Sequence, residues 1–283
     1  MAPEVEKQAS SEQRDLSIII RCGRDREGLL RCLNSIDVTA DIVISGSHGD
    51  PFLKEPSFAQ YTLAPHVYGN WSVAAETGLQ AAKNNNIIVM DSDSRFASGA
   101  ILSIYNALKE GHLLVQPRVV FLIDNTWFSQ LISNVRTHEN RYQPKSYSPG
   151  LGLKRAELVE KIGVDGHIYN PRVLYGDDGY LDQQAKAADI DVYVAEDALI
   201  YHDPIKLEHE LKAAFRFGQG EYQLEQHPTS IWTQVVQGLL NREARDYLKS
   251  ARGTYGEKTL YFILLWRLIY IAGFTYEKSK HRI

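Results

Sequence analysis

Cysteine is scarce in this sequence, which has only Cys22 and Cys32 among its 283 residues. Two thiols argue against a disulfide framework, which needs several cysteine pairs, and against a zinc cluster, which needs more cysteine ligands. The chain also lacks an apolar stretch near its start of the kind found in secretory signals. We therefore expect the protein to work in a reducing compartment, the cytoplasm.

A basic excess is also missing. The sequence has 31 Lys and Arg against 35 Asp and Glu, which gives a formal net charge of −4. Proteins that bind nucleic acid neutralise its phosphates with Lys and Arg and are usually basic as a result. We therefore expect no nucleic-acid partner, and any phosphate should be bound by a few local groups.

Internal repeats and low-complexity segments are absent as well. The composition, 44% hydrophobic and 23% charged, is that of an ordinary globular protein. Residues 1–14 are polar without an apolar period, which predicts a disordered tail. We place the main domain at 15–203 and a helical C-terminal region at 204–283.

Apolar runs alternate with helical patterns in the first third of the chain. Strands are predicted over 15–23, 40–47 and 86–90, and helices over 26–36 and 72–83. This alternation predicts an α/β fold with an open, mostly parallel sheet that helices flank on its faces. Ligands of such sheets bind at the carboxyl ends of the strands.

Later segments continue the pattern. The sequence predicts a helix over 97–111, a strand over 112–122 that Pro117 bends or places at an edge, a turn or strand and a helix over 148–163, and a helix and a strand over 176–195. Beyond Asp203 the pattern is helical, which predicts a C-terminal helical appendage.

Asp91 and Asp93 follow the apolar run 86–90 directly. Two carboxylates at this spacing are able to approach one hard divalent cation that phosphate oxygens and water also bind. The alternative is a solvated turn in which an aspartate caps the next helix. The pair alone does not decide between these interpretations.

Two further groups carry candidate chemistry. Asp177 and Asp178 are adjacent, and they either cap a helix that begins around Gly179 or include a general base whose pKa its neighbour raises. His202 ends a predicted strand, where an imidazole is either structural or completes a metal shell that carboxylates begin.

Taken together, these pieces resemble the family 2 inverting glycosyltransferases of the GT-A fold, from about Leu16 to Pro228. Asp91 lies thirteen positions after Gly78, which matches the family's usual interval. The segments that carry the resemblance are "SIIIRCGRDREGLLRCLNSI", "SVAAETGLQAAKNNNIIVMDSD", "SPGLGLKRAELVEKIG", "DDGYL", His202 and "FRFGQGEYQLEQHP". Their order along the chain makes the likeness specific.

The resemblance implies a GT-A catalytic domain over 15–203 that moves a sugar from a nucleotide donor, a UDP-sugar by default, to a hydroxyl of a glycan or glycolipid. It implies Mn²⁺ or Mg²⁺ bound by Asp91, Asp93 and His202. It makes Asp178 the catalytic base and Asp177 its support, and one base without a nucleophile implies inversion. The expected donor contacts are Arg21, Ser45, Asp91, Ser92 and Arg216.

The segment "FRFGQG" suggests a mobile flap, in which Arg216 meets the phosphates while Gly218 and Gly220 serve as hinges. The end of an ordinary amphipathic helix is the alternative interpretation.

The sequence departs from the family pattern at several positions. Ser45 stands where the family has an aspartate that contacts the base, unless the loop of Asp50 reaches back. Ala75 and Glu76 replace a usual Arg-Asn. Two alternatives therefore stay open: a GT-A protein that binds nucleotide sugars without turnover, and a sugar-phosphate nucleotidyltransferase, which needs a more glycine-rich loop after the first strand.

The stretch "TLYFILLWRLIYIAGFTY" is eighteen residues long, nearly enough to span a bilayer. Arg267 at its centre opposes spanning, because a charge there costs roughly 2.5–3.5 kcal/mol on insertion. Basic residues follow it, so we expect residues 259–283 to lie peripherally on the inner face of a membrane. Packing on the catalytic domain, or on a second subunit in a homodimer, is the alternative.

Overall fold

The computed structural model describes residues 15–67, 69–142, 149–173, 175–224 and 241–280. The tail expected at 1–14, the end of the resembling segment at Pro228 and the basic residues after 280 lie outside these ranges. The strands are β1 Leu16–Cys22, β2 Asp41–Gly46, β3 Thr62–Leu63, β4 Asn86–Asp91, β5 Ser94–Phe96, β6 Leu114–Phe121, β7 Leu151–Lys154 and β8 Val192–His202.

The α-helices are α1 Arg26–Asn34, α2 Trp71–Ala81, α3 Ala100–Lys109, α4 Trp127–Tyr142, α5 Arg155–Ile162, α6 Asp177–Ala187, α7 Leu207–Leu224, α9 Arg242–Tyr255 and α10 Glu257–Lys280. Two short 3₁₀ turns, Pro51–Lys54 and Pro56–Phe58, connect β2 to β3.

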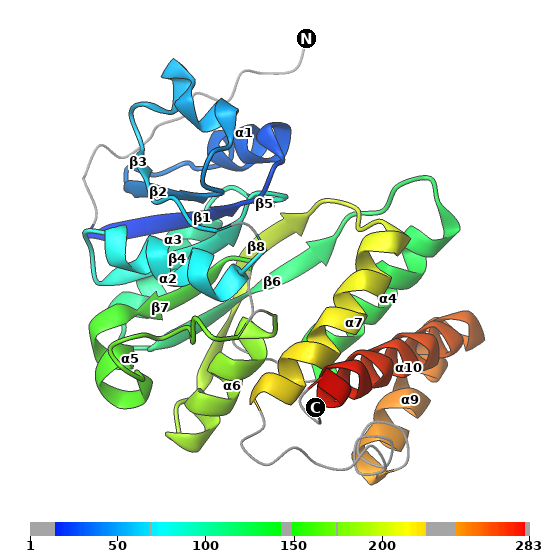
Figure 1. The fold of residues 1–283 in the computed structure, drawn as a ribbon. Coiled ribbons are helices and arrows are strands. Elements are labelled where there is room, and N and C mark those ends of the chain that lie inside the picture. The colour runs from blue at the N-terminus through cyan, green and yellow to red at the C-terminus, as the bar shows by residue number, and fades with distance from the viewer. Residues whose placement is uncertain (1–14, 68, 143–148, 174, 225–240, 281–283) are drawn as a thin grey trace.

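All eight strands form one sheet in the order β3-β2-β1-β4-β7-β6-β8-β5 (Figure 1). Strands β3, β2, β1 and β4 run parallel to one another, as do β6 and β8, whereas β7 and β5 are antiparallel to their neighbours. The predicted α/β class, with a mostly parallel sheet and a C-terminal helical appendage, is confirmed.

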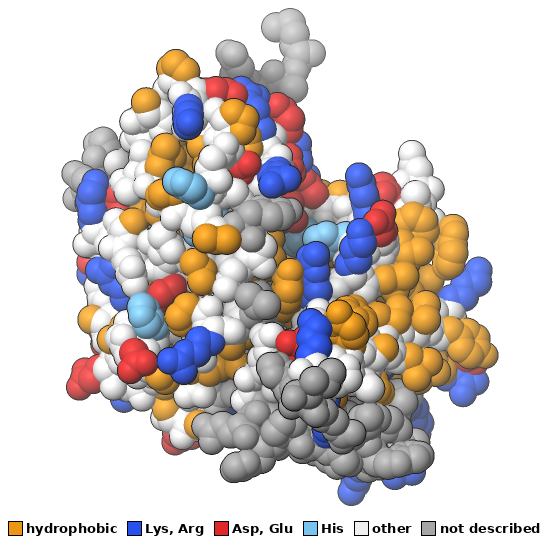
Figure 2. Space-filling model, viewed as in Figure 1, with side chains coloured by type: hydrophobic (Ala, Val, Ile, Leu, Met, Phe, Trp, Pro, Cys, Tyr) orange, Lys and Arg blue, Asp and Glu red, His pale blue; other side chains and the backbone are white. Residues whose placement is uncertain are grey.

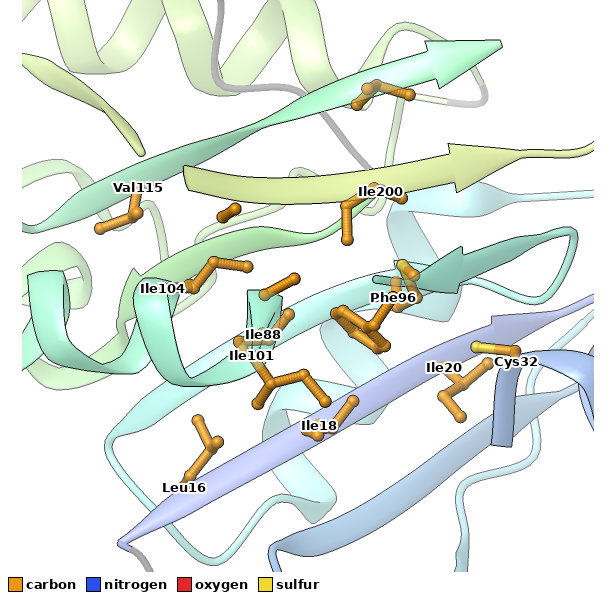
Figure 3. Packing of buried hydrophobic residues seen from close by; sticks show 14 of the residues in the cluster. Leu16, Ile18, Ile20, Cys32, Ile88, Phe96, Ile101, Ile104, Val115 and Ile200 are labelled. Carbon is orange, nitrogen blue, oxygen red and sulfur yellow. The ribbon is translucent and has the colours of Figure 1, made fainter. Parts of the chain in front are cut away.

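The apolar runs of β1 and β4 are buried on both faces of this sheet. Ile18 and Ile20 face the cluster that α1 and α3 complete, and Figure 3 shows Ile18 near Ile101 of α3 and Ile20 near Cys32 of α1. Ile19 points the other way, into the cluster of α2, α5 and α6. A strand covered on both faces needs a continuous apolar run, which is the pattern that predicted it.

A third core joins the C-terminal helices to α4. Its buried side chains come from three helices, α4, α9 and α10: Leu131, Ile132, Val135, Tyr247, Ala251, Phe262 and Ile263. Helix α4 precedes β7 in the chain, and no sequence pattern predicted it. The helical layer therefore includes a segment from 15–203, and the domain boundary placed at Asp203 stays a prediction.

Two details of the sequence analysis are refined by the fold. Strand β6 lies between β7 and β8, so Pro117 marks a bend and not an edge: the pairing register with β8 shifts between Pro117 and Arg118. Both cysteines are free and buried, and burial raises the pKa of Cys22 to about 12. Neither thiol forms a disulfide, as expected.

Candidate functional site

The carboxyl ends of three parallel strands bring the predicted site residues together. In the sheet register, Arg21 of β1 lies between Ser45 of β2 and Asp91 of β4. A cavity of about 480 Å³ opens beside this edge. Its lining includes eight of the predicted residues: Arg21, Asp91, Ser92, Asp93, Asp177, Asp178, His202 and Arg216.

Arg21 is an ionic clamp below the cavity. Its Nε and Nη2 donate to the two carboxylate oxygens of Asp91 at 2.8 and 3.2 Å, and its Nη1 donates to Asp177. The residue is only 4% exposed, and its guanidinium lies 5.6 Å from the ring centre of Trp71. Burial alone lowers the pKa of Arg21, but the carboxylates around it hold that pKa well above its usual value.

These ion pairs bear on the roles predicted for Asp91 and Arg21. Both carboxylate oxygens of Asp91 accept hydrogen bonds from Arg21, so this side chain lines the cavity while it is bound to another residue of the protein. Arg21, which the sequence suggested for the donor, faces carboxylates in this geometry. Its role as a donor contact stays a prediction, as does the metal-binding role of Asp91.

Asp93 lies differently from Asp91. Its side chain is 46% exposed, and its Oδ1 lies 3.6 Å from Nε2 of His202, whose own side chain is 14% exposed. The antiparallel pairing of β5 with β8 places them together, because Ser94 pairs with His202 and the Asp203 N–H donates to the Asp93 carbonyl at 2.8 Å. Residues 109 positions apart in the chain thus meet, as the sequence analysis required.

The hydrogen bonding of His202 decides which ring nitrogen faces Asp93. Nδ1 lies 2.6 Å from the carbonyl oxygen of Asp203. A carbonyl only accepts, so Nδ1 carries the proton and donates. In the neutral ring Nε2 then holds a free lone pair, the form in which imidazole binds a metal.

The donor set suits a divalent cation that takes part of its shell from a substrate. Asp93 and His202 offer one oxygen and one nitrogen on the same side of the cavity. Within the described ranges, no group of three or more His, Cys, Asp or Glu side chains is close enough together to hold an ion. Phosphate oxygens and water therefore have to complete the shell, as is usual for Mg²⁺ at phosphate sites.

Asp177 and Asp178 point in different directions. Helix α6 begins at Asp177, immediately after Gly176 with its positive φ of 92° and two residues before the start expected around Gly179. Asp177 is buried against Arg21, whereas Asp178 is half-buried and lines the cavity. The geometry matches the division of roles that the sequence suggested, although catalysis by Asp178 remains a prediction.

Ser45 is not part of the cavity lining. It is fully buried, its hydroxyl donates to the Ala74 carbonyl at 2.6 Å, and it lies 3.3 Å from Nδ1 of His66. The donor contact predicted for Ser45 gains no support from this position. Asp50 is not part of the lining either: its carboxylate lies 3.9 Å from Arg24, and Oδ2 is buried without a partner among the described residues, so a contact of Asp50 with a nucleotide base stays a prediction.

Arg216 reaches the cavity from α7, with its guanidinium 4.9 Å from the ring centre of Tyr175. Gly218 and Gly220 are not hinges of a loop, because both lie inside the unbroken helix α7. A Cβ on Gly218 would lie 1.9 Å from the carbonyl oxygen of Tyr270 in α10, and one on Gly220 would lie 1.8 Å from that of Tyr175. They permit close packing, which corrects the flap interpretation.

Several residues near the site were missed by sequence reasoning. Glu76, noted only as a departure from the family, is buried and accepts the backbone N–H groups of Ile168 and Tyr169, each at 3.1 Å. It thereby positions the segment that precedes α6. A lone acid within an otherwise apolar helix face was the available signal, because a buried carboxylate needs partners.

A second missed group forms the far wall of the cavity. Glu210 of α7 is 1% exposed and accepts two hydrogen bonds from Arg136 of α4, at 2.8 and 3.0 Å. Nε1 of Trp266 in α10 donates to the same carboxylate at 2.9 Å. These hydrogen bonds connect α4, α7 and α10 beside the cavity. The sequence analysis did not predict α4, and it therefore missed this group of three side chains.

Comparison with known proteins identifies the fold. No family model matches the sequence, and no curated protein matches it. Residues 1–349 of Staphylococcus aureus TarS, solved with UDP-GlcNAc, superpose with a TM-score of 0.52 and 12% identity over 94% of this chain and 91% of that one. Mannosyltransferase PcManGT of Pyrobaculum calidifontis, solved with GDP-Man and Mn²⁺, gives 0.55 and 13% over 95% and 88%. At this identity the likeness establishes the fold, over nearly the whole chain.

Proposed function

We propose that this protein is a metal-dependent inverting glycosyltransferase of family 2. It transfers a sugar from a nucleotide donor, a UDP-sugar by default, to a hydroxyl group of a glycan or glycolipid. The observation that carries the proposal is the position of Asp93, His202 and Asp178 around one cavity at the carboxyl edge of the sheet. Both compared structures share this fold and hold nucleotide sugars, one of them with Mn²⁺.

The donor end of the reaction uses Asp93, His202 and Arg216. Asp93 and the free lone pair of His202 Nε2 would hold the cation, and the charge of that cation would offset the negative charge that grows on the departing diphosphate. Arg216 adds a positive charge to the cavity from α7, where its guanidinium packs on the ring of Tyr175. Asp91 keeps Arg21 in place and so maintains the shape of the cavity floor.

The acceptor end uses Asp178. A sugar hydroxyl has a high pKa, so a carboxylate has to accept its proton while the new bond forms at the anomeric carbon. Both aspartates at the start of α6 line the cavity, and Asp177 is the one that accepts a hydrogen bond from Nη1 of Arg21. We therefore assign the base to Asp178. A single displacement without a protein nucleophile inverts the anomeric configuration.

A thermal-shift screen with nucleoside diphosphates, with and without Mn²⁺, tests donor binding. A ligand at about 100 times its Kd stabilises the native state by about 2.7 kcal/mol. We expect UDP to raise the melting temperature only when Mn²⁺ is present, and Asp93→Ala to remove this increase. The matched control is Asp197→Ala, which removes an exposed aspartate of β8 and should retain it.

The same assay separates the alternatives. A GT-A protein without turnover would bind the diphosphate and yet release none from a UDP-sugar during prolonged incubation. A sugar-phosphate nucleotidyltransferase would release pyrophosphate from a nucleoside triphosphate in the presence of a sugar phosphate. A lack of any Mn²⁺-dependent shift with every nucleotide would contradict the proposed donor site.

A further inference from the structure

Helix α10 leaves one apolar side uncovered. Its exposed large hydrophobic residues are Tyr261, Leu265, Leu268 and Tyr276, at 64, 45, 57 and 49% exposure. Their spacing of four, three and eight residues puts them on one side of the helix, which we name the outer stripe. Soluble proteins seldom leave such a stripe bare unless it binds something.

The charges of α10 do not interrupt this stripe. Between Lys258 and Lys278 the helix has only two charged residues, Arg267 and Glu277. Arg267 turns inward, with its guanidinium 5.1 Å from the ring centre of Tyr247 in α9. Glu277 is 6% exposed and accepts hydrogen bonds from Gln219 and Gln223 of α7. The central arginine, which opposes spanning of the bilayer, therefore lies on the inner side of the helix and leaves the outer stripe uncharged.

The packing of α10 distinguishes lying on a membrane from crossing one. Among the described residues, α10 is the one helix long and apolar enough to span a bilayer. It is held along α7, because Gly273 and Gly218 allow close contact of the two backbones. Trp266 also donates to buried Glu210 of α7. Spanning would break these contacts, whereas docking by the outer stripe would keep them.

Exposed apolar side chains continue from the outer stripe toward the start of α4. Trp127 of α4 is 71% exposed, and Ile123 before it is 50% exposed. Figure 2 shows hydrophobic side chains gathered where Figure 1 places α4 and the first half of α10, with Lys and Arg at the rim. Aromatic residues beside a leucine stripe suit the boundary between lipid headgroups and acyl chains.

The neighbouring charge favours an anionic partner. Helices α9 and α10 together have eight Lys and Arg against four Asp and Glu, although the whole chain has a net charge of −4. Four of these basic residues are exposed along α9: Arg242, Arg245, Lys249 and Arg252. A second copy of this surface would bring like charges together in a symmetric dimer. Anionic headgroups complement it.

We infer that the outer stripe and the exposed start of α4 dock this protein on the surface of an anionic lipid bilayer. The apolar side chains enter the interfacial region, and the basic side chains of α9 and α10 meet the headgroups. The inference needs no assumption about the reaction in the cavity.

Flotation of the full chain with vesicles of phosphatidylcholine and phosphatidylglycerol tests the inference. We expect the wild type to float with the vesicles. The double variant Leu265→Glu with Leu268→Glu should bind the vesicles at least about tenfold more weakly, because two large side chains lose their burial in lipid. The matched control, Leu102→Glu with Val164→Glu, makes the same charge change at 38 and 49% exposed positions on other elements and should float like the wild type.

Three outcomes would overturn the inference. The first is a full chain that remains unbound at every content of anionic lipid. The second is equal loss of binding in the control variant. The third is a dimer, measured by light scattering, that the Leu265→Glu and Leu268→Glu changes dissociate while vesicle binding is unaltered. Both variants should keep the circular dichroism spectrum of the wild type, which excludes misfolding as the cause.

Discussion

Replacing Asp177 by Asn should destabilise the fold, whereas the same change at Asp178 should remove turnover and cost less stability. The two residues are adjacent, identical in type and at the start of the same helix. They differ in what they contact. Asp177 is buried against Nη1 of the 4% exposed Arg21, and Asp178 lines the cavity.

The size of each effect follows from these contacts. Asp177→Asn keeps the shape but removes one negative charge from a buried guanidinium, and a hydrogen bond between charged groups contributes about 1.5–3 kcal/mol. At roughly 2–4 °C per kcal/mol in a protein of this size, the melting temperature should fall by about 3–12 °C. Asp178 is only half-buried, so the same change there should cost less stability than at Asp177.

Calorimetry and steady-state kinetics on the two variants measure these effects. Removing a general base slows the reaction about 10²–10⁴-fold. We expect that loss of kcat for Asp178→Asn, with the affinity for the donor maintained. An unchanged melting temperature for Asp177→Asn would refute the reasoning about the clamp. A dead Asp177→Asn variant beside an active Asp178→Asn variant would reverse the catalytic roles.

Three further predictions concern the metal pair, the helical layer and its pH dependence. His202→Asn should weaken UDP binding in the presence of Mn²⁺ at least about tenfold, measured by calorimetric titration; an unchanged affinity in Mn²⁺ would contradict a metal role. Gly218→Ala should destabilise the protein by about 1–3 kcal/mol, because its Cβ would meet the Tyr270 carbonyl at 1.9 Å; Gly253→Ala, with open space around its Cβ, is the control. Burial lowers the pKa of His138. Its contribution to the free energy of unfolding is therefore full above the ordinary pKa of 6.5 and is lost as the pH falls through the lower folded-state pKa. His138→Gln should make the free energy of unfolding, measured with urea, less dependent on pH over that range, and an unaltered pH profile would contradict this.

The part of the fold nearest the site was predictable because its signals are local. Strands β1 and β4 are buried on both faces, so their apolar runs are continuous and identify them. Since parallel strands end at one edge, the positions of Asp91 and Asp93 in the chain already placed them at a binding edge. The meeting of Asp93 with His202 came from the family resemblance and not from the sequence pattern.

The remaining features depend on contacts between distant residues. Arg21 and Asp177 are 156 positions apart, and nothing in either segment indicates their pairing. The buried residues that share a core with Leu131, Ile132 and Val135 of α4 come from α9 and α10, more than a hundred residues later in the chain. Gly218 resembled a hinge because glycine permits both flexible turns and close helix packing, and the sequence alone does not say which.

The measurement that tests the central claim most directly is release of nucleoside diphosphate from a panel of UDP- and GDP-sugars, followed for the wild type, Asp93→Ala and Asp178→Asn. The account predicts release that requires Mn²⁺ or Mg²⁺ and stops on chelation. It predicts loss of that release in both variants, although Asp178→Asn still binds the donor. Release that persists under chelation, or in both variants, would contradict a cation held by Asp93 and a base at Asp178.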